Sequence, residues 1–208
     1  MRNFVTLKSL RRLPVIFKIQ AGLVVIALVV SVFAGTLANH GGYQTIAFAT
    51  PALTKPTMSW NGEVNQFAVQ VSNAFGIDVR RAREFSSWIL EASERQNIDA
   101  ELIASLVLTE SSFRKNARSH VGAIGPAQVR ADYWSGFCGT SDLTDPAENV
   151  FCGAQILSYY QDRCGAIDCA LQAYNIGLYA TDAYRLQAGR RYVAKVGRLR
   201  TQLQNVAL

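Results

Sequence analysis

Apolar residues recur at intervals of three and four positions along much of the chain beyond residue 60. Such spacing places them on one face of an α-helix. Five stretches follow this pattern: 64–75, 82–92, 102–110, 147–160 and 168–174. Asp99 stands where it can cap the third helix. No stretch alternates apolar and polar residues with a sustained period of two, so the sequence predicts a mainly α domain.

A different hydrophobic pattern lies near the N-terminus. Residues 19–38 carry no charge over 20 positions, and a helix of that length spans about 30 Å, the thickness of a bilayer core. Residues 1–18 hold five basic residues and no acid. The pattern predicts a single-pass inner-membrane helix with a basic cytoplasmic segment before it and the rest of the chain in the periplasm. A cleaved signal peptide is the alternative, because small residues at 36–38 and 47–49 suit cleavage.

The remaining residues divide into a stalk and one domain. Residues 39–60 contain Gly, Pro and Thr without an apolar period, which indicates a stalk. Residues 61–208 are enough for one hydrophobic core. The net charge of +6 comes almost wholly from residues 1–18, so it does not indicate nucleic-acid binding. Residues 183–208 hold six basic residues and no acid, and indicate either contact with anionic partners or a solvated helix face.

All four cysteines lie in the part predicted to be exported. An even number of cysteines in an oxidising compartment indicates disulfides. Three pairings are open, and the sequence favours the two local ones, Cys138 with Cys152 and Cys164 with Cys169. A zinc site is disfavoured because there is no Cys-x-x-Cys pair and the chain has only two histidines. We therefore expect no metal and no cofactor.

Glu110 is the main catalytic candidate. It continues the apolar face that contains Ile103 and Leu106, seven and four residues earlier. A carboxyl group among aliphatic side chains is desolvated, which raises its pKa. A carboxylic acid can then donate a proton near neutral pH. The alternative is a Glu at a frayed helix end with its carboxylate in water.

Two later segments carry candidate binding residues. Gly122 and Gly125 allow positive φ and close approach of the backbone to a ligand. Pro126 suits the first turn of a new helix. Gln128 would then lie one turn into that helix and offer the donor and acceptor that sugar hydroxyls and acetamides need. The second segment, 173–177, is a helix end with Asn and Gly. Each segment taken alone is equally consistent with an ordinary turn or helix cap.

Taken together, these segments resemble the signature blocks of soluble-lytic-transglycosylase (SLT) domains. The order and the separations of the blocks match, and the resemblance covers about residues 78–200. Two further blocks, in 149–157 and at Tyr192-Val193, also match. The resemblance rests on Glu110-Ser-Ser-Phe, Ser119, Gly122-Ala-x-Gly125-x-x-Gln128 and Ala173-Tyr174-Asn175-x-Gly177.

The resemblance implies a lysozyme-like fold that cleaves the MurNAc–GlcNAc β-1,4 bond of peptidoglycan strands. Glu110 would protonate the glycosidic oxygen and then take the proton of the muramic C6 hydroxyl as that oxygen closes on C1. The product is a 1,6-anhydro ring. The substrate supplies the nucleophile, so no second carboxylate is needed, and the next acid in the sequence is Asp132. The residues implied to bind substrate are Ser119, Gly122, Gly125, Gln128, Tyr174 and Asn175.

Two departures from the family pattern stand out. Ala127 replaces a Met that usually precedes the Gln, which is expected to widen the subsite. An acid that often precedes the closing Tyr-Val is missing at 188–191. A hydrolytic muramidase of the same fold and a non-catalytic wall-binding protein are the alternative functions. The sequence leaves open whether the chain serves wall turnover, an envelope-spanning machine or a phage particle.

Overall fold

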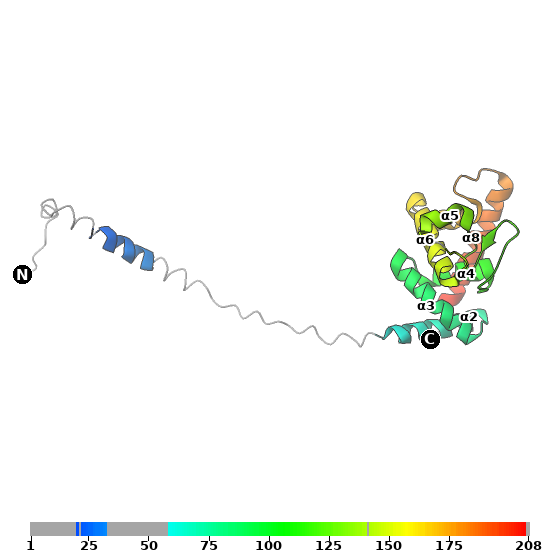
Figure 1. The fold of residues 1–208 in the computed structure, drawn as a ribbon, viewed down its shortest axis with the longest axis horizontal. Helices are drawn as coiled ribbons and strands as arrows, with labels where there is room; N and C mark the ends of the chain where they lie inside the picture. Colours follow the sequence, from blue (N-terminus) through cyan, green and yellow to red (C-terminus); the bar gives the residue numbers. More distant parts are fainter. Residues whose placement is uncertain (1–19, 21, 33–57, 141, 207–208) are drawn as a thin grey trace, which may run out of the picture. The chain divides into compact units, whose positions relative to one another are not determined.

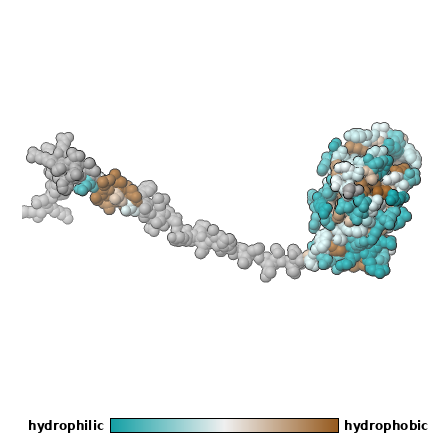
Figure 2. All heavy atoms as spheres, viewed as in Figure 1, coloured by the Kyte–Doolittle hydropathy of each residue, from teal (hydrophilic) through white to brown (hydrophobic). Residues whose placement is uncertain are grey.

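The computed structural model describes residue 20 and residues 22–32, 58–140 and 142–206. The chain divides into two units, Met1–Lys55 and Pro56–Leu208. In the first unit, residues 22–32 are helical, and most of their exposed side chains are hydrophobic (Figure 2). Within the described residues, no helix combines the length and the apolar character needed to cross a membrane. The predicted segment 1–18, most of the stalk and part of the span 19–38 lie outside the described residues.

Seven α-helices and one short β-hairpin form the described part of the second unit (Figure 1). Each of the five apolar-periodic stretches falls within a helix, so the predicted mainly α domain is confirmed. In chain order the elements are α2 (Trp60–Phe75), α3 (Val79–Gln96), α4 (Ala100–Ser111), β1 (Ala123–Ile124), β2 (Val129–Arg130), α5 (Ala131–Cys138), α6 (Pro146–Cys164), α7 (Ile167–Ile176) and α8 (Ala183–Gln204).

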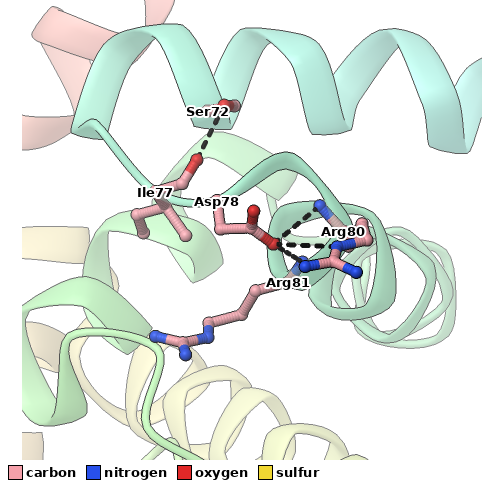
Figure 3. A network of polar contacts seen from close by, with 5 residues as sticks. All are labelled: Ser72, Ile77, Asp78, Arg80 and Arg81. Carbon is pink, nitrogen blue, oxygen red and sulfur yellow. Dashed lines mark hydrogen bonds and ion pairs between the residues drawn. The ribbon is translucent and has the colours of Figure 1, made fainter.

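Polar residues define the junction between α2 and α3. The Ser72 hydroxyl, in the last turn of α2, donates to the carbonyl of Ile77 at 2.7 Å. Asp78 Oδ1 accepts the backbone N–H groups of Arg80 and Arg81, each at 3.2 Å, and so caps α3 (Figure 3). These bonds satisfy backbone groups that the helix ends would otherwise leave unpaired.

Helix α4 lies at the centre of the core. Eight of its 12 residues are buried, as expected for a helix that is apolar on nearly every side. It packs against α3 and α8, and Leu106 and Val107 are among the largest fully buried side chains. Because α4 is enclosed by its neighbours, its last turn provides a rigid base for Glu110.

The predicted helix start at Pro126 is wrong. Residues 125–128 instead form the turn of an antiparallel hairpin in which β1 pairs with β2. Gly125 and Gln128 have φ values of 76° and 51°, in the left-handed region that a right-handed helix cannot contain. The next helix, α5, begins at Ala131. Its eight residues and the two-residue strands are too short to leave a periodic signal.

Two disulfides link neighbouring helices. Cys138, the last residue of α5, is bonded to Cys152 in α6, with Cα atoms 5.3 Å apart. Cys164, the last residue of α6, is bonded to Cys169 in α7. These are the two local pairs that the sequence favours.

Candidate active site

The end of α4 places Glu110 at the edge of the core. The helix ends at Ser111, and Ser112 and Phe113 then both take positive φ, 54° and 58°. Two consecutive left-handed residues turn the chain sharply away from the helix axis. Phe113 is fully buried and packs edge-on against Phe85, with ring centroids 5.1 Å apart. This anchor fixes the turn directly after Glu110, which is itself only partly exposed.

The carboxyl group of Glu110 receives a short hydrogen bond from a distant part of the chain. The Tyr192 hydroxyl, on α8, donates to Glu110 Oε1 at 2.6 Å. Burial raises the pKa of Glu110; the bond from Tyr192 and the charge of Lys195 act in the opposite direction with smaller effect. Burial, together with the negative charge of Glu110, holds the pKa of Tyr192 well above its ordinary value, so the phenol stays a donor. Glu110 therefore has the environment of a general acid.

Glu110 opens into a cleft of about 260 Å³. Five of the residues predicted from the sequence line it: Glu110, Ser119, Gln128, Tyr174 and Asn175. Glu110 is the only acid among the described residues that line the cleft. Asp132 is exposed and pairs instead with Arg130. The other lining residues are Val121, Ala123, Val129, Arg130, Trp134, Ile156 and Tyr160.

The β-hairpin forms one wall of the cleft and is held from behind by Asn149. This fully buried residue of α6 donates from Nδ2 to the carbonyl of Ile124 at 2.9 Å and accepts the N–H of Ala127 at 2.8 Å. A Cβ on Gly125 would lie 2.3 Å from the Asn149 side chain. Gly125 is thus needed for this close approach, and neither it nor Gly122 is among the described residues that line the cleft.

Polar side chains of the cleft are also fixed by the hairpin. The Ser119 hydroxyl accepts the N–H of Ala123 at 2.9 Å, and Gln128 Nε2 donates to the carbonyl of Gly125 at 2.9 Å. The buried hydroxyl of Tyr174 donates to the carbonyl of Ala127 at 2.8 Å. These bonds hold the side chains in one orientation, so little conformational entropy remains to be lost when a ligand binds.

Ala127, which is expected from the sequence to widen the subsite, belongs to the buried core. It is 1% exposed and is not among the described lining residues. A Cβ on Gly153 would lie 2.5 Å from the Ala127 Cβ. The small side chain therefore lets the hairpin lie close to α6, and a longer one would have to displace that helix.

Sequence reasoning missed two features of the site. The bond between Tyr192 and Glu110 joins residues 82 positions apart, and no local pattern indicates such a contact. The aromatic side chains of Trp134 and Tyr160 reach the cleft from α5 and α6. The position of Tyr192 in the closing Tyr-Val block was the available signal that it belongs to the site.

An α-helical domain with a recessed acid in a polar cleft fits the lysozyme-like class that the resemblance implies. The transglycosylase SLT domain family matches residues 87–195, about half of the chain. The chain therefore belongs to this family.

The chain is also similar to individual proteins that are named as transglycosylases. The chain is 37% identical over 86 residues to a transglycosylase of Enterobacteria phage PRD1, covering 41% of this chain and 32% of that protein. It is 36% identical over 107 residues to a membrane-bound lytic murein transglycosylase C of Mannheimia succiniciproducens, covering 47% and 30%. It thus spans about a third of the length of these curated relatives.

A solved structure of an inactive mutant of the lytic transglycosylase Slt from Pseudomonas aeruginosa is also similar. The sequence identity is 19% and the TM-score is 0.49. The match covers 69% of this chain and 30% of that chain.

Proposed function

We propose that this protein is a peptidoglycan lytic transglycosylase, which cleaves the MurNAc–β-1,4–GlcNAc bond and leaves a 1,6-anhydromuramic end. The observation that carries the proposal is Glu110: a partly buried acid with a raised pKa, and the only acid among the described residues of its cleft. Membership in the SLT family supports the proposal. So do the names of relatives that are lytic murein transglycosylases.

The proposed reaction uses Glu110 twice. Protonated Glu110 gives its proton to the glycosidic oxygen, and the bond between that oxygen and the muramic C1 breaks. The resulting carboxylate then takes the proton of the C6 hydroxyl as O6 bonds to C1. The nucleophile is part of the substrate, so the step is effectively unimolecular. A hydrolase of the same fold would instead need a water positioned near C1, with a second carboxylate about 5–9 Å from the acid in most glycosidases.

The remaining cleft residues are proposed to hold the substrate. Ser119, Gln128, Tyr174 and Asn175 line the same cleft as Glu110 and carry hydroxyl and amide groups. Such groups match the donors and acceptors of an acetamide. Tyr192 is a positioning residue in this scheme, because its bond to Oε1 fixes the carboxyl plane. Oε2 has no hydrogen-bond partner among the described residues and is free for the substrate.

We propose that the catalytic domain, residues 61–208, acts in the periplasm and is held at the inner membrane by residues 19–38, with 1–18 in the cytoplasm and 39–60 as a stalk. The uncharged span, its basic flank and the two disulfides support this arrangement. The full-length protein should resist extraction by carbonate, and protease added from the periplasmic side should reach residues beyond 39. A soluble mature form that begins near Asn39 or Thr50 would contradict the anchor and establish cleavage.

The role of Glu110 is tested by two matched substitutions on α4. Glu110→Gln keeps the shape of the side chain but cannot donate a proton to the leaving oxygen, so clearing of purified sacculi should slow by about 10²- to 10⁴-fold. Glu101→Gln, in the first turn of the same helix, should leave the rate unchanged. If Glu110→Gln clears sacculi within about tenfold of the wild-type rate, the assignment is wrong.

A further inference from the structure

Four aromatic side chains of α5 and α6 form a continuous surface, here called the aromatic wall. Its members are Trp134, Phe137, Tyr159 and Tyr160. Trp134 packs edge-to-face against Phe137 at 5.3 Å and against Tyr160 at 5.7 Å between ring centroids. Phe137 packs in the same way against Tyr159 at 5.1 Å. Each ring thus supports the next in a geometry that aromatic pairs prefer.

The aromatic wall begins inside the cleft and extends outside it. Trp134 and Tyr160 line the cleft that contains Glu110, whereas Phe137 and Tyr159 are not among the described lining residues. Phe137 is 40% exposed, and Tyr133 beside it on α5 is 66% exposed. The surface that Phe137 and Tyr159 present is therefore continuous with the candidate site.

Core packing explains Trp134, which lies against the hydrophobic core, but it does not explain Phe137 and Tyr133, which are exposed. None of the eight residues of this helix is buried. Its end is held by the disulfide from Cys138 to Cys152 and by a bond from Gln155 Nε2 to the carbonyl of Phe137 at 3.3 Å. Large aromatic side chains that remain partly exposed on a helix fastened in this way indicate a surface for a partner.

The size and chemistry of the site indicate what the partner is. A cleft of about 260 Å³ is at the lower limit for one small ligand, so a glycan strand must continue beyond it. Sugar rings have flat C–H faces that pack on aromatic rings, and hydroxyl edges that need hydrogen bonds. The guanidinium of Arg163 lies over Tyr159 at 4.3 Å, and that of Arg130 over Tyr133 at 4.2 Å. Both can donate to groups at the edges of such rings.

We propose that the aromatic wall is a glycan-binding subsite that holds sugar residues of the strand outside the catalytic cleft. The inference rests on the proposed function, because it takes the cleft to bind the same strand. The Cys138–Cys152 disulfide keeps α5, and with it Trp134 and Phe137, in place against α6. A long strand gains contacts with the wall that a short fragment confined to the cleft cannot make.

The test measures binding of chito-oligosaccharides to the full-length protein by calorimetry. Glu110→Gln is the background throughout, so that no ligand is cleaved. The hexasaccharide should bind more tightly than the trisaccharide. Adding Phe137→Leu, which keeps an apolar side chain but removes the flat ring, should weaken hexasaccharide binding by about two- to tenfold. Phe137→Trp should restore it. The trisaccharide affinity should not change in either variant.

A matched control and two contrary outcomes complete the test. Tyr184→Leu removes a ring that is 77% exposed on α8, a helix that contributes no residue to the aromatic wall, and should leave both affinities unchanged. Equal binding of the hexasaccharide by the Phe137→Leu and parent proteins would overturn the proposal. So would a loss of binding to anionic lipid vesicles without any loss of glycan binding, which would make the wall a membrane contact. This binding measurement does not depend on the chemical form of the cleaved ends. A failure of the proposed lyase activity would therefore be a separate result.

Discussion

Replacement of Tyr192 by Phe should move the pH dependence of the reaction in a defined direction. The Tyr192 hydroxyl donates to Glu110 Oε1 at 2.6 Å and lowers the pKa of that carboxyl against the larger effect of burial. Phe keeps the ring and removes only the donor. The charged form of Glu110 then loses its partner, and the pKa of Glu110 rises further. The first chemical step requires protonated Glu110, so activity should persist to higher pH.

The size of this displacement follows from the strength of the bond. Hydrogen bonds to charged groups contribute about 1.5–3 kcal/mol, and those to neutral groups about 0.5–1.5 kcal/mol. Only the difference, roughly 1–1.5 kcal/mol, alters the balance between charged and neutral Glu110. At about 1.4 kcal/mol for each tenfold change in the protonation equilibrium, the alkaline limb of the profile should move up by about one pH unit.

The assay is the initial rate of sacculus solubilisation, followed as kcat/KM from about pH 4 to about pH 9. Tyr184→Phe is the matched control, because Tyr184 lies on the same helix and is 77% exposed. Its profile should coincide with that of the wild type. If the alkaline limb of Tyr192→Phe also coincides with the wild type, or moves to lower pH, the reasoning about Glu110 is refuted.

Three further predictions concern stability. Because the folded-state pKa of Glu110 is raised above 4.5, its charge opposes folding at neutral pH. Urea denaturation should therefore give Glu110→Gln a larger free energy of unfolding than the wild type near pH 7, and this gain in stability should be lost near pH 3. Equal gains at both pH values would contradict the prediction. Reducing both disulfides should lower the free energy of unfolding by about 2–4 kcal/mol, and an unchanged urea midpoint would argue against it. Gly125→Ala should lower the melting temperature more than Gly122→Ala, with a loss of stability that is larger by about 1–3 kcal/mol. Both glycines have positive φ, but only a Cβ at position 125 would clash with Asn149. Equal losses would exclude the clash.

The helices were predictable because their signals are local. The stretches 64–75, 102–110 and 147–160 each carry enough apolar positions at helical spacing to favour a helix over other secondary structure. The hairpin was not predictable in this way, since each strand has two residues. Its geometry depends on Asn149, which comes from α6 and bonds across more than 20 positions. Residue spacing in one segment contains no information about such a partner.

The site shows the same division between local and long-range information. The apolar face of α4 predicts that Glu110 lies at the core, and the structure shows it partly buried with a raised pKa. The donor that Tyr192 supplies comes from α8, and α5 brings Trp134 into the cleft. Both depend on how helices pack against one another. Packing angles and distances follow from all the side chains of an interface, which no single motif records.

The central claim is that the nucleophile comes from the substrate and not from water. The most direct measurement is digestion of purified sacculi in ¹⁸O-water, followed by mass spectrometry of the released muropeptides. The account predicts unlabelled products with anhydromuramic ends, about 18 Da lighter than reducing ends because no water has been added. Reducing ends that carry ¹⁸O at the muramic C1 would contradict the account and identify a hydrolytic muramidase.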